Sequence, residues 1–267
     1  MLPRAVLLSI CGCLLLTSAQ AFVPAPARSV PPPSSSTALC ATYNNVFVAG
    51  GSKGVGRLVI DKLLQQGSKV IALVRREDVA EDLNAIEGVT AIVGDAFDQK
   101  TVENAMDGCD AAITTLGGST QDEGTRIDYV GNSNVIESAG ILGVQRIVLV
   151  TSVGCGSSRE AAPEAVFETL KEVLLAKEKA ENVLIKYYTN SNWSIVRPGG
   201  LKSDPATGNA ILTEDNKSIG TIHREDVASL VVQCLESPKT ERKILTAIDP
   251  SIESAMATSA EVEAFLL

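Results

Sequence analysis

Short apolar runs alternate with longer amphipathic stretches along the chain from Asn45 onward. The short runs are typical of buried parallel strands, and an apolar spacing of three or four residues in the longer stretches is typical of helices. Strands are predicted at 46–49, 69–74, 89–93, 111–115, 146–150 and 193–196, and helices at about 54–66, 78–86, 101–106, 126–139 and 163–188. This alternation predicts an α/β fold, in which helices flank both faces of one doubly wound parallel sheet.

A glycine-rich turn, Gly50–Gly56, lies between the first predicted strand and the first predicted helix. In that context the glycine pattern indicates a Rossmann-like dinucleotide-binding turn. Gly50 permits a tight turn, Gly54 lets the backbone approach a pyrophosphate, and Gly56 allows the helix to pack closely on the strand. The helix N-terminus then faces the anion, and Ser52 and Val55 are among the predicted cofactor contacts. The alternative is a glycine-rich turn that binds no ligand.

Cations surround the position where the ribose of such a cofactor would lie. The second predicted strand ends in Arg75 and Arg76, no acidic residue precedes Glu77, and Lys53 stands in the glycine-rich turn itself. NAD-specific sites place an acid after this strand to bind the ribose 2′-hydroxyl, whereas cations there favour a 2′-phosphate. The sequence therefore predicts NADP(H). The alternative is that the two arginines form an ordinary solvated strand end.

Composition and charge narrow the possible partners. The 267-residue chain is 45% hydrophobic and 21% charged, and its net charge of −9 argues against nucleic acid and anionic membrane surfaces. Two of the six cysteines lie in the N-terminal region, and the other four show no metal-ligand spacing with one another or with histidine, so no metal site is predicted. Outside the N-terminal region no apolar run is long enough to span a membrane, so no span is predicted in the mature protein.

The first 42 residues differ in composition from the rest. Residues 1–21 combine one positive charge, an apolar run and a small-residue cleavage site, which indicates a signal peptide. Residues 22–42 are rich in Ser and Pro and lack acidic residues, which indicates a transit peptide. The pair resembles the bipartite presequences of algae with complex plastids and implies import into the stroma; plain secretion is the alternative. A single NAD(P)-binding domain at 43–250 and a C-terminal tail at 251–267 are then expected.

Further motifs follow the later strands and the long helix. They are Val93-Gly-Asp95, Leu116-Gly-Gly118, Val150-Thr-Ser152, Lys177-x-x-x-Glu181 and Arg197-Pro-Gly-Gly-Leu201. Together with the glycine-rich turn they resemble the short-chain dehydrogenase/reductase superfamily, in its atypical NAD(P)H-binding branch. Relatives there include NmrA-like sensors, biliverdin and flavin reductases, and a subunit of the plastid inner-envelope translocon. The resemblance covers roughly residues 45–249.

The resemblance implies roles for several of these residues. Asp95 would accept a hydrogen bond from the adenine amino group, and Leu116 and Gly117 would line the adenosine ribose. An acid at the carboxyl end of a parallel strand also lies at the ligand edge of the sheet, although a helix cap or turn role is the alternative for Asp95. The remaining predicted cofactor contacts are Ala96, Thr151, Pro198 and Gly199. Of these, Pro198 and Gly199 would form the wall beside the nicotinamide.

Full members of the superfamily carry a Tyr-x-x-x-Lys pair on the long helix and a serine after the fifth strand. Ser152 and Lys177 match this pattern and are the candidate catalytic residues, but the tyrosine position is Val173. Alcohol dehydrogenation and sugar epimerisation need an acid/base there, so both are disfavoured. Lys177 lies in phase with the apolar stripe of its helix and needs a partner, such as a nicotinamide-ribose hydroxyl, unless it reaches water at the helix edge. The alternative for Ser152 is a strand-end hydroxyl bonded to local backbone.

Three further features lie near the expected nicotinamide. Cys155 is either redox-active or a small buried residue, and His223 either reaches the substrate or has a structural role. The polar stretch Lys202–Gly220 is the candidate substrate lid.

The sequence favours an NADPH-dependent reductase that passes hydride to a small conjugated acceptor, such as a quinone, a flavin or a tetrapyrrole-like ring. Such acceptors can take their proton from solvent, so the missing tyrosine matters less for them. The first alternative is a non-catalytic NADP(H) sensor or scaffold of the plastid that binds a protein partner. A sugar-nucleotide epimerase or dehydratase is the third hypothesis, and the fold by itself does not decide among them.

Overall fold

The computed structural model describes residues 42–118, 125–187, 192–254, 257 and 262–267. Within these residues eight strands form one sheet in the order β3-β2-β1-β4-β5-β6-β10-β8, and neighbouring strands are parallel except β10 and β8. The strand order reverses between β1 and β4, as in a Rossmann-like doubly wound sheet. The predicted fold class is therefore confirmed. The predicted signal peptide at 1–21 lies outside the described residues, as does the predicted transit peptide at 22–42 except for its last residue.

The apolar runs of the sequence correspond to the six strands at the centre and one edge of this sheet. Each predicted run differs from its strand by at most a few residues at either end, because a run that is buried on both faces is apolar at nearly every position. The strands are β1 (Asn45–Ala49), β2 (Lys69–Val74), β3 (Val89–Val93), β4 (Ala111–Thr114), β5 (Arg146–Val150) and β6 (Asn192–Pro198).

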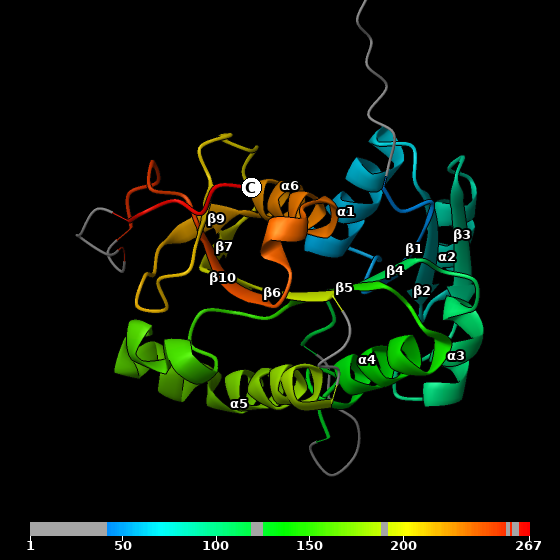
Figure 1. The fold of residues 1–267 in the computed structure, drawn as a ribbon, viewed down its shortest axis with the longest axis horizontal. Coiled ribbons are helices and arrows are strands. Elements are labelled where there is room, and N and C mark those ends of the chain that lie inside the picture. Colours follow the sequence, from blue (N-terminus) through cyan, green and yellow to red (C-terminus); the bar gives the residue numbers. More distant parts are fainter. Residues whose placement is uncertain (1–41, 119–124, 188–191, 255–256, 258–261) are drawn as a thin grey trace, which may run out of the picture. The chain divides into compact units, whose positions relative to one another are not determined.

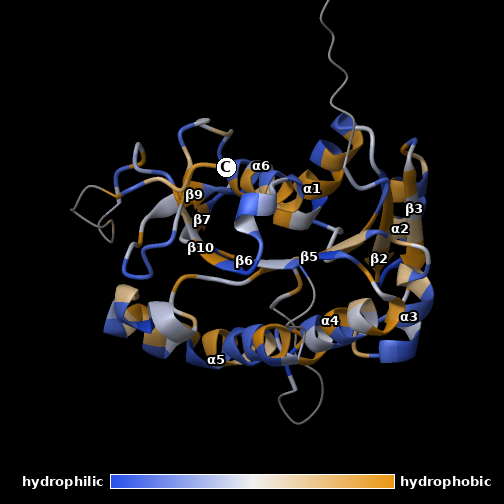
Figure 2. Cartoon of the chain, in the orientation of Figure 1, coloured by the Kyte–Doolittle hydropathy of each residue, from blue (hydrophilic) through white to orange (hydrophobic). Residues whose placement is uncertain are grey.

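Helices cover both faces of the sheet (Figure 1). On one face lie α1 (Gly54–Gln65), α2 (Glu77–Asn84) and α6 (Arg224–Glu236), and on the other lie α3 (Gln99–Met106), α4 (Val130–Leu142) and α5 (Glu164–Tyr187). The helices turn apolar residues toward the strands (Figure 2), and fully buried side chains such as Ile60 and Ile147 lie in the two resulting clusters. Burial of one aliphatic side chain of this size contributes about 1.5–3 kcal/mol, so the two layers fix the strand ends in place.

The C-terminal part of the domain contains elements that the apolar pattern does not predict. They are β7 (Gly200–Lys202), β8 (Ile211–Thr213), β9 (Thr221–His223), α6 and β10 (Lys243–Ile248), with short 3₁₀ turns at Gly156–Ala161 and Pro238–Thr240. β7 and β9 pair with each other, and β8 pairs with β10 at the edge of the main sheet. The candidate lid, Lys202–Gly220, is therefore not a loop throughout, because β8 anchors its middle. Strands of three residues are too short for an apolar run to reveal them.

Candidate functional site

The glycine-rich turn connects β1 to α1 at the carboxyl edge of the sheet. Gly50 has a φ of +89° and Gly54 has a φ of +60°, a region that residues with a side chain rarely adopt. A Cβ atom at Gly56 would lie 2.3 Å from the carbonyl oxygen of Gly50, so only glycine lets α1 begin this close to β1. The backbone amides in the first turn of α1 are thereby presented at the sheet edge, where an anion is bound well.

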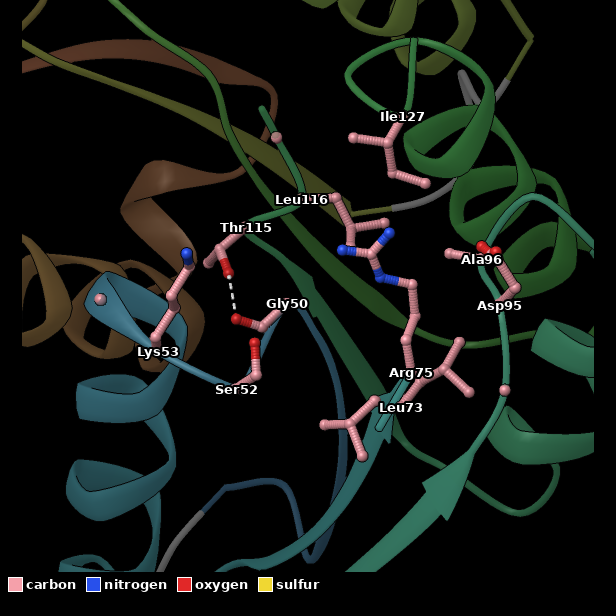
Figure 3. Close-up of a pocket in the computed structure, with 14 residues that line it drawn as sticks. Gly50, Ser52, Lys53, Leu73, Arg75, Asp95, Ala96, Thr115, Leu116 and Ile127 are labelled. Carbon is pink, nitrogen blue, oxygen red and sulfur yellow. Dashed lines mark hydrogen bonds between the residues drawn. The ribbon is translucent and has the colours of Figure 1, made fainter. Parts of the chain in front are cut away.

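A first pocket, of about 250 Å³, opens beside this turn (Figure 3). The ends of β1, β2, β3 and β4 all contribute to it, which explains how residues far apart in sequence meet there. The predicted residues in its lining are Gly50, Ser52, Lys53, Gly54, Arg75, Asp95, Ala96, Leu116 and Gly117. The other lining residues, which were not among the predicted cofactor contacts, are Leu73, Val74, Gly94, Thr115 and Ile127.

The two arginines at the end of β2 have different environments. Figure 3 shows the guanidinium of Arg75 extending across the first pocket toward Leu116. Arg76 does not line the pocket; its side chain is 73% exposed and pairs with Asp78 in the first turn of α2. The hydrogen bond between them raises the pKa of Arg76 and lowers the pKa of Asp78. The structure thus brings Arg75, but not Arg76, to Lys53 at the pocket.

Asp95 lies in the first pocket and also has a local role. One of its carboxylate oxygens, Oδ1, accepts a hydrogen bond of 3.0 Å from the backbone amide of Phe97. It does not cap the following helix, because Asp98 is the N-cap of α3. The turn role that the sequence left open is present, and the side chain still lines the pocket.

A second pocket, of about 270 Å³, adjoins the first at the glycine-rich turn, because Lys53 and Thr115 line both. The other predicted residues in its lining are Val55, Gly56, Thr151, Ser152, Lys177 and Pro198. The rest of its lining is Val150, Leu170, Val173, Leu174, Leu201 and Arg224. The structure therefore brings both candidate catalytic residues to one place.

Gly199 does not line either pocket. A Cβ atom at Gly199 would lie 2.2 Å from the carbonyl oxygen of Gly220, and the amide of Gly200 donates a hydrogen bond to that same oxygen. Gly199 thus lets the link between β6 and β7 pass close to the chain that leads into β9. Its position serves backbone packing between Pro198 and Leu201, which line the second pocket.

Lys177 has a charged partner that the sequence did not reveal. Its Nζ lies 3.6 Å from Oδ1 of Asp128 and donates a hydrogen bond of 3.4 Å to the carbonyl oxygen of Leu116. The Asp128 side chain is fully buried, accepts a hydrogen bond from the amide of Gly118 and pairs with Arg126. The lysine is therefore neither isolated nor at a helix edge. Its ammonium group ties α5 to the loop that follows β4, at a side-chain exposure of 12%.

A buried ion pair lies under the second pocket. Glu181, one turn beyond Lys177 on α5, accepts hydrogen bonds of 3.0 and 2.7 Å from the guanidinium of Arg197 on β6. It also accepts one of 2.6 Å from the hydroxyl of Thr151, and Arg197 donates a further bond to Ser157. Both charged side chains are 3% exposed. This network fixes the end of β5, the end of β6 and α5 relative to one another.

Ser152 and Cys155 follow β5, and their surroundings differ. The hydroxyl of Ser152 donates to the carbonyl oxygen of Val153 at 3.0 Å while the residue lines the second pocket, so both interpretations of Ser152 have support. Cys155 is fully buried and lines neither pocket. Burial raises the pKa of the Cys155 thiol to about 12, which disfavours a reactive thiolate.

His223 lies at the end of β9, outside both pockets. Its ring nitrogens lie 3.7 Å from a carboxylate oxygen of Asp204 and 3.9 Å from one of Asp226. Asp226 in turn accepts hydrogen bonds from the amides of Thr207 and Gly208. These contacts favour a structural role for His223 in holding the segment before β8. In the described part of the chain, no three His, Cys, Asp or Glu side chains are grouped to hold a metal ion.

Sequence reasoning missed Asp128, Arg224 and the supporting role of the Glu181–Arg197 pair. Asp128 belongs to no motif, and the only indirect signal for it is that Lys177 needs a partner. Arg224 lies directly after His223, in a stretch where the sequence draws attention to the histidine instead. None of the described helices has both the length and the apolar character that a membrane span requires.

Comparisons with known proteins agree with this geometry. A family model described as NAD(P)H-binding matches residues 50–238. A Bacillus subtilis protein named as an uncharacterised sugar epimerase, YhfK, is 31% identical over 217 residues, covering 79% of this chain and 98% of that one. An uncharacterised chloroplastic protein of Arabidopsis thaliana is 32% identical and covers 75% of each chain.

Two proteins named as reductases are also similar. The solved structure of ChuY, described as an anaerobilin reductase of Escherichia coli O157:H7, has a TM-score of 0.72 and 29% identity, covering 79% of this chain and 100% of that one. Sanguinarine reductase of Eschscholzia californica is 29% identical, covering 74% of this chain and 86% of that one.

Proposed function

This chain belongs to the NAD(P)H-binding family, and from that premise we propose that it is an NADPH-dependent reductase that passes hydride to a small conjugated acceptor. The acceptor is a quinone, a flavin or a tetrapyrrole-like ring. One observation carries the proposal: two pockets adjoin at the glycine-rich turn, and the second holds Ser152 and Lys177 beside an apolar residue, Val173, where a proton-donating tyrosine is expected.

The first pocket fits the adenosine half of the cofactor. A Cβ atom at Gly50 would lie 2.6 Å from Oγ1 of Thr115, so a residue with a side chain would not fit at this position of the turn. Arg75 and Lys53 supply positive charge for a 2′-phosphate, and no acid follows β2 within the pocket lining to bind a 2′-hydroxyl instead. These features support NADPH over NADH.

The second pocket fits the nicotinamide half and an acceptor. When bound there, NADPH supplies the hydride. Lys177 donates hydrogen bonds from a position fixed by Asp128, which suits a ribose hydroxyl, and Ser152 offers a hydroxyl for a carbonyl. Val173 leaves the tyrosine position without a proton donor. The pocket therefore favours an acceptor that takes its proton from solvent after reduction.

The named relatives support a reductase more than an isomerase. Anaerobilin reductase and sanguinarine reductase are both reductases by name. The Bacillus subtilis relative carries the name of a sugar epimerase but is uncharacterised. Epimerisation needs an acid/base in the pocket, and Val173 cannot supply one.

A plastid location is part of the proposal. Its support is the composition of residues 1–42 and the similarity to a chloroplastic protein. Fusion of residues 1–42 to a fluorescent protein tests it in an alga with a complex plastid. Fluorescence inside the plastid is expected, whereas fluorescence in the secretory pathway would reject the plastid location.

The experiment that tests the function mixes the protein with NADPH and a panel of quinones, flavins and tetrapyrroles, and follows the loss of nicotinamide absorbance. Turnover with one acceptor class is expected. Tight NADPH binding with no oxidation across the panel would contradict the proposal and favour a sensor or scaffold, and the search would then move to protein partners.

A further inference from the structure

The second pocket carries positive charge that its own lining does not neutralise. Its described lining holds Lys53, Lys177 and Arg224 but no aspartate or glutamate, in a chain whose net charge is −9. Lys177 pairs with Asp128. Among the described residues, neither Lys53 nor Arg224 forms an ion pair with a carboxylate. Cations gathered in a pocket of an acidic protein attract an anionic ligand.

The charges of the cofactor account for only part of this excess. Under the proposed function, the amides of the glycine-rich turn bind the pyrophosphate, while Arg75 and Lys53 lie at the first pocket, where the 2′-phosphate is expected. Arg224 does not line the first pocket. Its charge is therefore not assigned to the 2′-phosphate, and it lines the second pocket, where the acceptor is expected.

Arg224 is held in one place by the fold. It is the first residue of α6 and follows His223, which is buried, so its backbone is fixed on both sides. Its Nη1 donates a hydrogen bond of 2.7 Å to the hydroxyl of Ser203, and its Cδ passes 3.9 Å from where a Cβ of Gly54 would lie. A guanidinium has five N–H donors in a planar fork, which matches a carboxylate with two parallel hydrogen bonds.

Apolar side chains stand exposed around the same pocket. Leu170 on α5 and Leu201 on β7 are each 41% exposed, and both line the pocket together with Val173. A pocket lined mainly by apolar side chains, with a few polar groups among them, has the usual form of a small-molecule site. These apolar side chains are suited to the flat face of a conjugated ring.

We propose that the acceptor is a conjugated ring that bears a carboxylate, with Arg224 binding the carboxylate while the ring lies against Leu170, Val173 and Leu201. Arg224 is then a residue that determines substrate specificity. The inference rests on the proposed reductase function, because only a reductase has an acceptor. The binding preference that it predicts can nevertheless be measured without turnover.

The test compares acids with their esters as acceptors. The probes are biliverdin and its dimethyl ester, and a naphthoquinone carboxylic acid and its methyl ester. For each, the KM in NADPH oxidation and the Kd in the presence of NADP+ are measured with the unmodified protein and with Arg224→Gln. The unmodified protein is expected to bind each acid more tightly than its ester. Arg224→Gln is expected to raise the KM and Kd for the acid by about tenfold or more, and to leave those for the ester within about twofold.

A matched control is Arg57→Gln. Arg57 lies on α1 near the same turn, but it pairs with Asp61 and does not line the second pocket. This variant is expected to keep the preference for the acid. Equal binding of acid and ester by the unmodified protein would overturn the proposal, as would a preference that survives in Arg224→Gln.

Two further outcomes separate the inference from the function on which it rests. If no probe is reduced but an Arg224-dependent preference for the acid appears in the Kd, the anion subsite stands and the reductase function fails. If Arg224→Gln instead weakens NADPH binding and changes the Kd for the acid and for the ester by the same factor, Arg224 belongs to the cofactor site and the proposal is wrong.

Discussion

At the scale of single residues, the proposed preference for a phosphorylated cofactor rests on only one arginine of an adjacent pair. Arg75 and Arg76 are neighbours in sequence, but successive side chains at the end of a strand point to opposite sides. Arg75 reaches the first pocket, and Arg76 turns to Asp78 in solvent. Of the three cations Lys53, Arg75 and Arg76, the first two line the first pocket, where the proposed 2′-phosphate would bind.

Arg75→Ala is expected to raise the Kd for NADPH by about 10- to 100-fold, because a hydrogen bond to a charged group is lost. The Kd for NADH should change little, because NADH has no 2′-phosphate. Arg76→Ala is the matched control and should leave both constants within about twofold. Fluorescence titration of the bound nicotinamide measures all four. A loss of NADPH affinity in Arg76→Ala but not in Arg75→Ala would contradict the assignment.

Lys177 and Asp128 form the second feature at this scale. Lys177→Met is expected to lower hydride transfer by at least about tenfold, because the nicotinamide ribose loses a hydrogen-bond donor and its orientation. Asp128→Asn should act in the same direction, since Lys177 then loses the charge that holds it. Binding of 2′,5′-ADP, which occupies only the adenosine side, should stay nearly constant in both.

Lys171→Met is the control for these two variants. Lys171 is on the same helix, α5, but it pairs with Glu168 at the surface, away from either pocket. Single-turnover kinetics with an acceptor from the panel gives the rate. An unchanged rate in Lys177→Met would remove this lysine from the mechanism.

At the scale of elements, α5 is the part that joins the site to the sheet. It carries Val173 and Lys177 on the pocket side, and Glu181 connects it to β5 through Thr151 and to β6 through Arg197. A buried pair of this kind is costly to desolvate, so its net contribution to stability is small. Removing one partner lowers the stability much more, because the other charge is then left buried without a counter-charge.

Glu181→Gln is expected to lower the free energy of unfolding by about 3–5 kcal/mol, since Arg197 loses its counter-charge while 3% exposed. Glu168→Gln, on the same helix, breaks a pair whose side chains are about half exposed and should cost less than about 0.5 kcal/mol. Urea denaturation measures both. Similar losses in the two variants would show that the buried network does not hold α5 in place.

At the scale of the whole molecule, the fold buries thiols that would otherwise ionise above pH 9. Burial raises the pKa of Cys155 and of Cys234 from 9.0 to about 12. At a pH between these two pKa values, the thiols of the folded chain keep protons that the thiols of the unfolded chain have released. The thiols thus contribute fully to stability below about pH 9, and the contribution is lost as the pH rises toward 12.

Stability is therefore expected to fall by roughly 1 kcal/mol per buried thiol between pH 8 and pH 10. The double variant Cys155→Ala/Cys234→Ala should lose less over the same interval, because it lacks both groups. Urea denaturation at several pH values between 8 and 10 gives the two slopes. Equal slopes of stability against pH in the two proteins would show that these thiols do not cause the loss of stability at alkaline pH.

The sequence by itself determined the fold class and the position of the cofactor turn. Both are local properties. A strand buried on two faces is apolar throughout, and a turn that needs positive φ at Gly50 and no side chain at Gly56 can use only glycine there. The carboxyl ends of parallel strands share one edge, so Asp95 and Leu116 could be assigned to a common site before any contact was known.

The tertiary structure alone decided which side chains face that site. It separated Arg75 from Arg76, paired Lys177 with Asp128, and brought Arg224 to the second pocket from the far end of the domain. It also placed β8 at the sheet edge, within a stretch that the sequence pattern assigned to a loop. Ion pairs and pocket linings depend on side-chain direction and on segments distant in sequence, and neither leaves a periodic signal in the chain.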